Sequence, residues 1–498
     1  MSVLIRNVRP VDLAQGRSTE PIDLALDRGR IAAWGPSLPA GPGQSVWSGD
    51  GRWIMPGLWD AHVHFRQWAQ VLSHLDLSQA DSAQRVLELV RARLDQPDPP
   101  ALLSGLGYRA PTWTVQPSVA ALDAVTGPRP TVLFSGDLHS AWFNSAALAR
   151  YGLAPRAGVV QEAELFGLTS RLTADQPRLT DQDFLDAQRR AAAAGLVGLV
   201  DFEAEPTFET WPERYDRVGR LKIVASTYPE HLSRAIATGR RTGQALVQRD
   251  GQALVTMGPL KVITDGALNT RTAHCLEPYL NAADLAQPHG VQTVPEAELT
   301  ELVARATAAG LEVALHAIGD AAVAIALAAV ERTGARGTIE HAQLVDWPDL
   351  DRMSRAGLAA SVQPAHLLDD QPAIDRIWPD RAERCFPLAS LAAAGVELRL
   401  GSDAPVAPLD PWLAVAAAVH RGQPEAPAWR PEQAIGPAQA LRASTRSTLA
   451  LGQPADLILL ERDPLASYPD SGAAAQALRH PQMAATWVAG DLVWSASA

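Results

Sequence analysis

The middle of the chain repeats a single unit, in which an amphipathic helix pattern is followed by a glycine and a short apolar strand. Pro295, for example, precedes the helical stretch EAELTELVARATAA, Gly310 follows it, and LEVALHAIGD then has the pattern of a strand. Strands that are apolar throughout are typical of a parallel sheet covered by helices. With 54–64 as the first strand the count reaches eight, which predicts a closed (β/α)8 TIM barrel. The other expected strands are 196–202, 221–227, 259–266, 311–320, 337–343, 358–364 and 396–405.

The two ends of the chain have a different pattern. Near the N-terminus, SVLIRNVRPVD, PIDLALDRGRIAAWGP and QSVWSGDGRWIMPG are short alternating runs broken by Gly, Pro and Asp, and ADLILLERDPL and AATWVAGDLVWSA near the C-terminus are similar. This pattern indicates antiparallel strands joined by turns. We therefore predict a small β-sandwich domain built from residues 1–56 and 443–498, and a barrel over 57–442.

One stretch interrupts the repeat after the first strand. About 130 residues separate His64 from the second expected strand, whereas one βα unit needs roughly 30–40. We therefore expect an insertion at about 66–165. Long insertions in a barrel lie on the loops after the strands, which line the active-site face.

Composition narrows the class of partner. The formal net charge is -12, which argues against nucleic acid and anionic membranes, because both require basic patches. Two cysteines, Cys275 and Cys385, are too few for a secreted disulfide scaffold. We find neither a signal-peptide pattern after Met1 nor an apolar run of the ~18 residues that a membrane span needs. We expect a cytoplasmic protein that acts on a small molecule.

Six residues with metal-binding or acid–base side chains stand at or just beyond the carboxyl ends of expected strands, which is the functional face of a barrel. They are His62, His64, Lys261, His316, His341 and Asp403. Alternation along a strand puts His62 and His64 on the same side. Imidazoles that converge from neighbouring strands make a site for Zn²⁺ or a similar cation.

Each residue also has an ordinary structural explanation. A lone histidine near a strand end is more often a hydrogen-bonded core or surface residue, a buried lysine can pair with a carboxylate, and Asp403 could cap a turn or a helix. Six such residues in successive units make coincidence a poor explanation. The spacing agrees, because His316 and His341 are 25 residues apart, about one βα unit, and Asp403 follows His341 by 62, about two.

Several longer strings carry a family resemblance. They are MPGLWDAHVH, GDLHSAWFNSAAL, KVITDGALNTRTAHCLEPY, LHAIGDAAV, IEHAQLV, SVQPAHLLDD, LGSDAPVAPLDPW and GQPADLILLERDP. Together with the H-x-H, Lys, His, His, Asp series, they resemble the amidohydrolase superfamily, in the amidohydrolase-3 branch typified by N-substituted formamide deformylase. The strings extend from Met55 to Pro464, so the resemblance covers nearly the whole chain.

The resemblance implies a metal centre with one or two divalent ions, zinc before others. His62, His64 and Asp403 would bind one cation, and His316 and His341 a second. Lys261 would bridge the two as a carbamate formed with CO₂, whereas an unmodified lysine would leave a mononuclear site. A homodimer is also implied.

The implied reaction is hydrolysis of a C–N amide-type bond in an N-substituted formamide, an N-acyl amine or a related small molecule. Metal-activated hydroxide would attack, with Asp403 as the general base that passes the proton to the leaving nitrogen. The oxyanion needs further donors, which His316 or His341 could supply if they are not fully used as ligands.

Substrate contacts are predicted at a second set of positions. Arg271 could clamp a carboxylate, or form a salt bridge that holds the 267–290 loop. The resemblance brings the DLHSAWFN string of the insertion near the pocket, although its side chains could equally form the insertion's own small core. The remaining candidates follow the seventh strand or lie in the insertion. The full set is Arg271, His139, Trp142, Asn144, Tyr108, Gln363 and His366.

Three alternatives stay open at this point. The same site could hydrolyse a cyclic amide, a carbamate or an ester. The chain could instead be a non-catalytic metal-binding barrel, although such a protein has no need of all six residues. A carbohydrate-active barrel with two carboxylates ranks last, because it leaves the histidine, lysine and aspartate series unexplained. The carboxylates available for it are Glu162, Glu164, Asp201 and Glu203.

Overall fold

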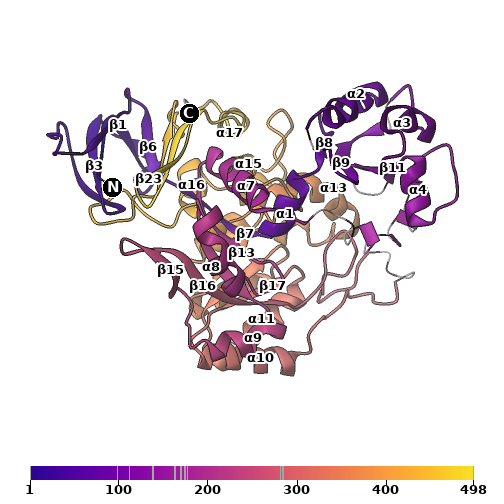
Figure 1. The fold of residues 1–498 in the computed structure, drawn as a ribbon. Helices are drawn as coiled ribbons and strands as arrows, with labels where there is room; N and C mark the ends of the chain where they lie inside the picture. The colour runs from indigo at the N-terminus through magenta and orange to yellow at the C-terminus, as the bar shows by residue number, and fades with distance from the viewer. Residues whose placement is uncertain are drawn as a thin grey trace. The chain divides into compact units, whose positions relative to one another are not determined.

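The described residues form two compact units. The computed structural model describes residues 2–97, 99–110, 113–136, 140–161, 164–165, 167–168, 171–172, 175, 178–280, 282 and 285–496. One unit comprises residues 1–65 with 188–498, and the other comprises 66–187. Figure 1 labels the elements of both, and each unit is described by itself.

The first unit contains the expected parallel barrel. Its eight strands are β7 (Leu58–Val63), β13 (Leu196–Asp201), β14 (Lys222–Thr227), β16 (Gln252–Ile263), β17 (Val313–Ala317), β18 (Gly337–His341), β19 (Ala359–Val362) and β20 (Glu397–Leu400). Each is paired in parallel with the next along the chain. The ring is nearly closed beyond the last strand, where Asp403 N donates to His62 O at 2.7 Å and His64 N donates to Ala404 O at 2.9 Å.

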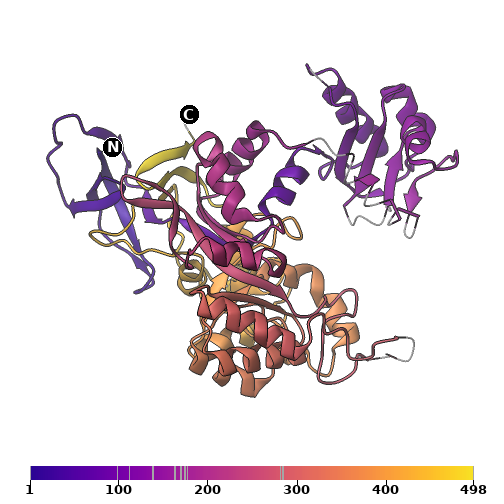
Figure 2. The ribbon, with the colours of Figure 1, turned by 60° about the horizontal axis from the view of Figure 1, so that its bottom comes forward.

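Helices follow the strands and cover the outside of the barrel (Figure 2). They are α8 (Thr207–Val218), α9 (Pro229–Ala237), α10 (Glu296–Ala308), α11 (Asp320–Thr333), α12 (Trp347–Ala356), α13 (Leu367–Ile377), α14 (Leu388–Ala393), α15 (Pro411–His420) and α16 (Pro437–Ala443). Helix α12 shows why they start and stop where they do. The Asp346 side chain accepts from Trp347 N at its start, and Gly357 ends it with a φ of 65°, a conformation that glycine adopts without strain.

Within the described residues, no helix combines the length and the apolar composition that a membrane span requires.

Both termini contribute to a second sheet in the same unit, as the sequence predicts. Its strands run in the order β23 (Asp491–Ser495), β22 (Met483–Val488), β21 (Leu457–Leu460), β6 (Trp53–Pro56), β1 (Ser2–Asp12), β3 (Ile22–Asp27) and β4 (Arg30–Gly35). Strand β1 pairs with β3 and with β5 (Ser45–Ser48) through its first half, and with β6 through Arg9 and Pro10. It therefore passes from one part of the sheet to the other. Ile5 and Leu24 from one part pack in a common core with Leu459 and Trp487 from the other.

A hairpin extends one barrel strand beyond the expected pattern. Strand β16 is longer than the sequence stretch 259–266 suggests, and its first half pairs antiparallel with β15 (Ala245–Arg249). The apolar repeat gives no sign of this extension, because the hairpin lies outside the helix–glycine–strand unit.

The unit 66–187 has its own sheet and its own core. Strands β8 (Leu75–Asp76), β9 (Leu103–Tyr108), β10 (Thr131–Ser135), β11 (Ser140–Phe143) and β12 (Val160–Gln161) form the sheet. Helices α2 (Ala83–Leu94), α3 (Val119–Thr126) and α4 (Ser145–Tyr151) belong to it (Figure 1). The unit spans Arg66–Ala187, and the stretch of about 66–165 expected as an insertion lies within it.

Candidate metal centre and active site

The six residues proposed as metal ligands all lie at the carboxyl ends of barrel strands. His62 belongs to β7, Lys261 to β16, His316 to β17 and His341 to β18. His64 and Asp403 follow β7 and β20 closely. The barrel topology therefore brings together side chains that are far apart in the sequence.

Three of these residues form a group that could hold a metal ion. His62, His341 and Asp403 each offer a ligand atom, and these atoms lie within 4.8 Å of one another. Asp403 Oδ1 is also 3.4 Å from His64 Nε2. His64 Nδ1 is buried and has no hydrogen-bond partner among the described residues. Nitrogen and carboxylate donors converging in this way fit a cation such as zinc.

His316 lies beside this group without belonging to it. Its ring centroid is 4.4 Å from that of His341, but its Nε2 is 3.3 Å from Gly266 O and 3.4 Å from Asp265 Oδ1. Asp265 is fully buried and accepts from Ile318 N, Gly319 N and His274 N. Burial raises the pKa of Asp265 to about 7. Asp265 therefore orients His316 and holds the loop behind it.

The protonation states suit metal binding. Burial lowers the pKa of His62 and of His341 well below the usual value, and lowers that of His316 to about 4, so all three imidazoles are neutral near pH 7. For Asp403 burial alone would raise the pKa, but the neighbouring His62 and the hydrogen bond with His64 outweigh it. The pKa of Asp403 consequently lies well below its usual range, and the carboxylate is ionised. Neutral imidazoles and an ionised carboxylate are the ligand forms of these side chains.

Lys261 occupies an unusual environment for a lysine. Its side chain is buried, with Nζ 3.4 Å from His62 Nε2 and 4.6 Å from the centroid of the Phe202 ring. Among the described ion pairs none joins Lys261 to a carboxylate, and burial lowers its pKa to about 8. More of this amine is therefore uncharged near neutral pH than of an exposed lysine, although the charged form still predominates. The chain contains only one other lysine, Lys222.

Glu340 supports His62, a contact that no sequence pattern indicates. Its Oε2 is 2.6 Å from His62 Nδ1, both side chains are 1% exposed, and Thr338 Oγ1 donates to its other oxygen. An ionised carboxylate only accepts, so Nδ1 carries the proton and Nε2 keeps its lone pair for a ligand. Strand alternation would send Glu340 and His341 to opposite faces. His341 and Ala342 have φ of 71° and 43°, which breaks the alternation. Glu340 therefore contacts the His62 ring, and the His341 ring lies tilted beside that ring, with 5.1 Å between the centroids.

Asp60 joins the first strand to the last. Its Oδ1 accepts from His62 N at 3.0 Å and from Ser402 N at 2.9 Å, and burial raises its pKa to about 6. The two segments approach closely at Gly401, where a Cβ atom would lie 2.7 Å from His62 N. Asp403 itself has a φ of 58°. Strained backbone at such a residue is typical of functional sites.

Comparison with known proteins agrees with this geometry. The model of a family described as the amidohydrolase family matches residues 49–494. The chain belongs to the amidohydrolase family. YtcJ of Bacillus subtilis (strain 168), which carries an amidohydrolase name, is 27% identical over 461 residues, 84% of this chain and 86% of that protein. The N-substituted formamide deformylase of Arthrobacter pascens is 25% identical, over 99% of this chain and 98% of its own.

A solved structure shows the same fold. The crystal structure of an uncharacterized metal-dependent hydrolase from Pyrococcus furiosus matches with a TM-score of 0.74 and 24% identity, covering 94% of this chain and 100% of that one.

Two of the expected substrate contacts follow the seventh strand of the amidohydrolase barrel. The His366 ring stacks on His341 at 6.3 Å, and its Nε2 is 3.9 Å from Asp403 Oδ2. Gln363 is buried, and its Nε2 donates to Ser361 O at 3.2 Å. Arg271 lies in the loop after β16 with a φ of 53°. The structure thus brings His366 to the candidate metal centre, while the Gln363 side chain donates to the backbone of the strand that precedes it.

The expected contacts from the insertion have structural roles in the described residues. Trp142 is fully buried and donates to Ser118 O at 2.8 Å, and Tyr108 packs with it in the core of the 66–187 unit. Asn144 accepts from Ala147 N at 2.9 Å and caps α4. These are the contacts expected if the string forms the insertion's own core. His139 lies outside the described residues.

Two of the four carboxylates that a carbohydrate-active site would use, Asp201 and Glu164, take part in other contacts. Asp201 Oδ2 accepts from Trp211 Nε1 at 2.6 Å, and its Oδ1 accepts from Phe65 N and Glu203 N. Glu164 forms an ion pair with Arg156 in the 66–187 unit, and Glu162 lies outside the described residues. Asp201 therefore serves to hold the loops next to His64.

Proposed function

We propose that this protein is a metal-dependent hydrolase that cleaves a C–N amide-type bond in a small molecule. The observation that carries the proposal is the convergence of His62, His341 and Asp403, whose ligand atoms lie within 4.8 Å of one another at the carboxyl end of the barrel. Membership of the amidohydrolase family supports hydrolysis as the reaction class. The named relative N-substituted formamide deformylase makes N-substituted formamides, and then N-acyl amines, the first substrates to test.

A divalent cation, zinc before others, would be held by His62, His341 and Asp403 together with His64. When bound, such a cation supplies Lewis acidity, which polarises a carbonyl and makes water more acidic. Lys261 is the candidate for a carbamate, because an uncharged buried amine can react with CO₂ and the product is an anion beside the imidazoles. With that carbamate and His316, the site would have ligands for a second cation.

Asp403 is the general base of the proposal. Its carboxylate is ionised and lies 3.4 Å from His64 Nε2 and 3.9 Å from His366 Nε2. It can accept a proton from the attacking water and return it to the leaving nitrogen. His366 Nε2 is buried and has no hydrogen-bond partner among the described residues, so it is positioned to donate a hydrogen bond to substrate.

Replacement of Asp403 tests this assignment. We expect Asp403→Asn to lower kcat by about 100-fold to 10,000-fold on a formamide substrate, the usual contribution of a general base. Because Asp403 is also a proposed metal ligand, kcat is compared per metal-loaded chain after reconstitution with zinc. The measurement is steady-state kinetics alongside metal analysis of the same preparation. Retained turnover with bound metal would remove Asp403 from the mechanism. A substrate panel with cyclic amides, carbamates and esters separates the alternatives within the same site.

A further inference from the structure

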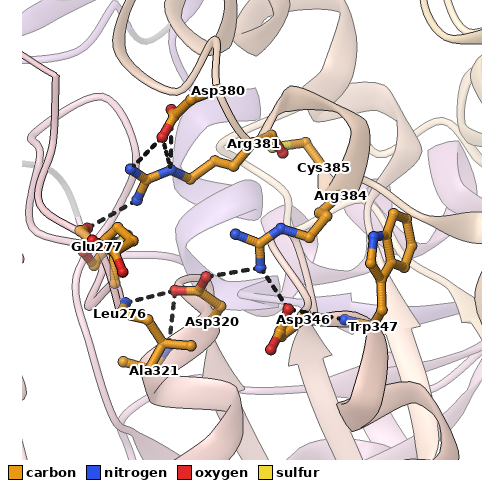
Figure 3. Close-up of polar contacts among 12 residues, drawn as sticks. Leu276, Glu277, Asp320, Ala321, Asp346, Trp347, Asp380, Arg381, Arg384 and Cys385 are labelled. Atoms are coloured by element: carbon orange, nitrogen blue, oxygen red, sulfur yellow. Dashed lines mark hydrogen bonds and ion pairs between the residues drawn. The ribbon is translucent and has the colours of Figure 1, made fainter.

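The loop after the fourth barrel strand is anchored at its far end by a polar network. This loop, residues 264–295, is called the strand-4 loop below. Asp320 at the start of α11 accepts from Leu276 N at 2.8 Å, and Arg381 donates to Glu277 O and Pro278 O at 2.8 and 3.0 Å (Figure 3). Arg384 completes the network by pairing with Asp320 at 2.9 Å (Figure 3). These bonds fix the far limb of the loop to the barrel.

The near limb of the strand-4 loop is held by one buried carboxylate. Asp370 lies in the first turn of α13 and is 8% exposed. Its Oδ1 accepts from Asn269 Nδ2 at 2.9 Å, and its Oδ2 accepts from Gln343 Nε2 at 2.9 Å. Asn269 follows β16, Gln343 follows β18 and Asp370 follows β19. A single side chain therefore joins three of the segments that lead away from the active-site end of the barrel.

The same helical segment carries His366 into the metal centre. His366 precedes Asp370 by four residues, so the two side chains lie one above the other along the segment. The His366 ring stacks on His341, and its Nε2 lies 3.9 Å from Asp403 Oδ2. A shift of the start of α13 would move His366 relative to both residues.

We propose that Asp370 is a positioning residue for substrate, which fixes the near limb of the strand-4 loop and the imidazole of His366 in one arrangement. This proposal rests on the proposed function in one respect, that the loop and His366 contact an amide-type substrate. Asp370 contacts none of the six metal-centre residues in the hydrogen bonds given above, so its loss should leave the metal in place and weaken substrate binding. Arg271, two residues beyond Asn269, would move with the loop.

Three variants and one matched control isolate this role. Asp370→Asn keeps the shape of the side chain but replaces one acceptor oxygen with an NH₂ group. That group faces one of the two donors, the amide of Asn269 or of Gln343, so one hydrogen bond is lost. Asp369→Asn is the matched control, because it makes the same change on the neighbouring, exposed residue. The double variant Asn269→Asp with Asp370→Asn exchanges donor and acceptor in the hydrogen bond between residues 269 and 370. The amide oxygen at position 370 can still accept from Gln343. Asn269→Ala, at an exposed position, removes one partner with little risk to folding.

Hydrogen–deuterium exchange and steady-state kinetics are measured on the metal-loaded proteins. In Asp370→Asn we expect faster exchange in residues 264–275 and a KM raised about tenfold with a smaller change in kcat, as for loss of one buried hydrogen bond. Asn269→Ala should show the same changes at smaller size, and the double variant should recover most of both. Metal content should stay constant in all of them.

Two results would overturn the proposal. One is that Asp370→Asn matches Asp369→Asn in exchange and in KM. The other is that the double variant is no better than Asp370→Asn. The exchange measurement needs no substrate, so it still decides the role of Asp370 in ordering the loop if the wild type hydrolyses none of the amides tested, a result that would count against the proposed function alone.

Discussion

Replacement of Glu340 by glutamine probes the support of the metal centre. The Glu340–His62 contact is 2.6 Å long and both side chains are almost fully buried, so it is a charge-assisted hydrogen bond shielded from water. Hydrogen bonds to charged groups contribute about 1.5–3 kcal/mol. Loss of a carboxylate behind a metal-binding histidine lowers metal affinity by about 10-fold to 100-fold, which is about 1.4–2.8 kcal/mol. The free energy of the hydrogen bond and the loss of metal affinity agree in size. We therefore expect Glu340→Gln to weaken zinc binding by about 10-fold to 100-fold.

The assay is a competition titration of the metal-free protein with zinc and a chelator of known affinity. Glutamine keeps the shape and can still accept from His62 and face Thr338, so the thermal midpoint of the metal-free protein should change little. Glu312→Gln, on an exposed glutamate just before β17, is the control and should bind zinc as the wild type does. An affinity for zinc within about twofold of the wild type in a folded Glu340→Gln protein would refute the supporting role of Glu340.

Two further predictions concern stability. Lys222 pairs with Asp456 at 2.6 Å, and both side chains are buried. Lys222→Met should leave the Asp456 carboxylate buried without its ion-pair partner and lower the free energy of unfolding by about 3–5 kcal/mol. We expect a lower urea midpoint with unchanged metal content. Burial raises the pKa of Asp201 to about 7 in the folded protein, whereas the pKa in the unfolded chain is near 3.9. The protonated carboxyl group therefore stabilises the folded state. This stabilisation is complete below about pH 4 and is lost as the pH rises to about 7. Asp201→Asn cannot titrate, so the gap in thermal midpoint between it and the wild type should narrow from pH 4.5 to 7.5, and a gap independent of pH would contradict this assignment.

The barrel and the placement of the six candidate ligands could be predicted because both depend on local patterns. Each helix–glycine–strand unit buries its apolar strand, and parallel strands put their carboxyl ends on one face. His316 and His341 therefore had to lie on the same side of the barrel once their strands were recognised. The terminal sheet was predicted for a similar reason, since its alternating runs need a partner strand to cover one face.

The roles of Glu340 and Asp370 could not be predicted, because they depend on contacts that no regular pattern signals. Glu340 contacts His62 only because the left-handed backbone at His341 and Ala342 breaks the strand alternation. Asp370 joins residues that are 27 and 101 positions away in the sequence, which no periodic pattern signals. The string around Trp142 resembled a substrate-binding segment, yet in the described residues Trp142 packs in the core of the insertion.

The number of metal ions bound by each chain decides between a metal-dependent hydrolase and a non-catalytic barrel. The protein is purified without a chelating tag, with bicarbonate in the buffers, and the metal in each chain is counted by mass spectrometry in the wild type and in Lys261→Ala. We expect about two ions in the wild type and fewer in Lys261→Ala, because a Lys261 carbamate would supply ligand atoms that alanine lacks. About one ion, insensitive to Lys261→Ala, would contradict the carbamate and leave a mononuclear hydrolase. No bound metal, even after reconstitution with zinc or manganese, would contradict the metal-dependent reaction itself.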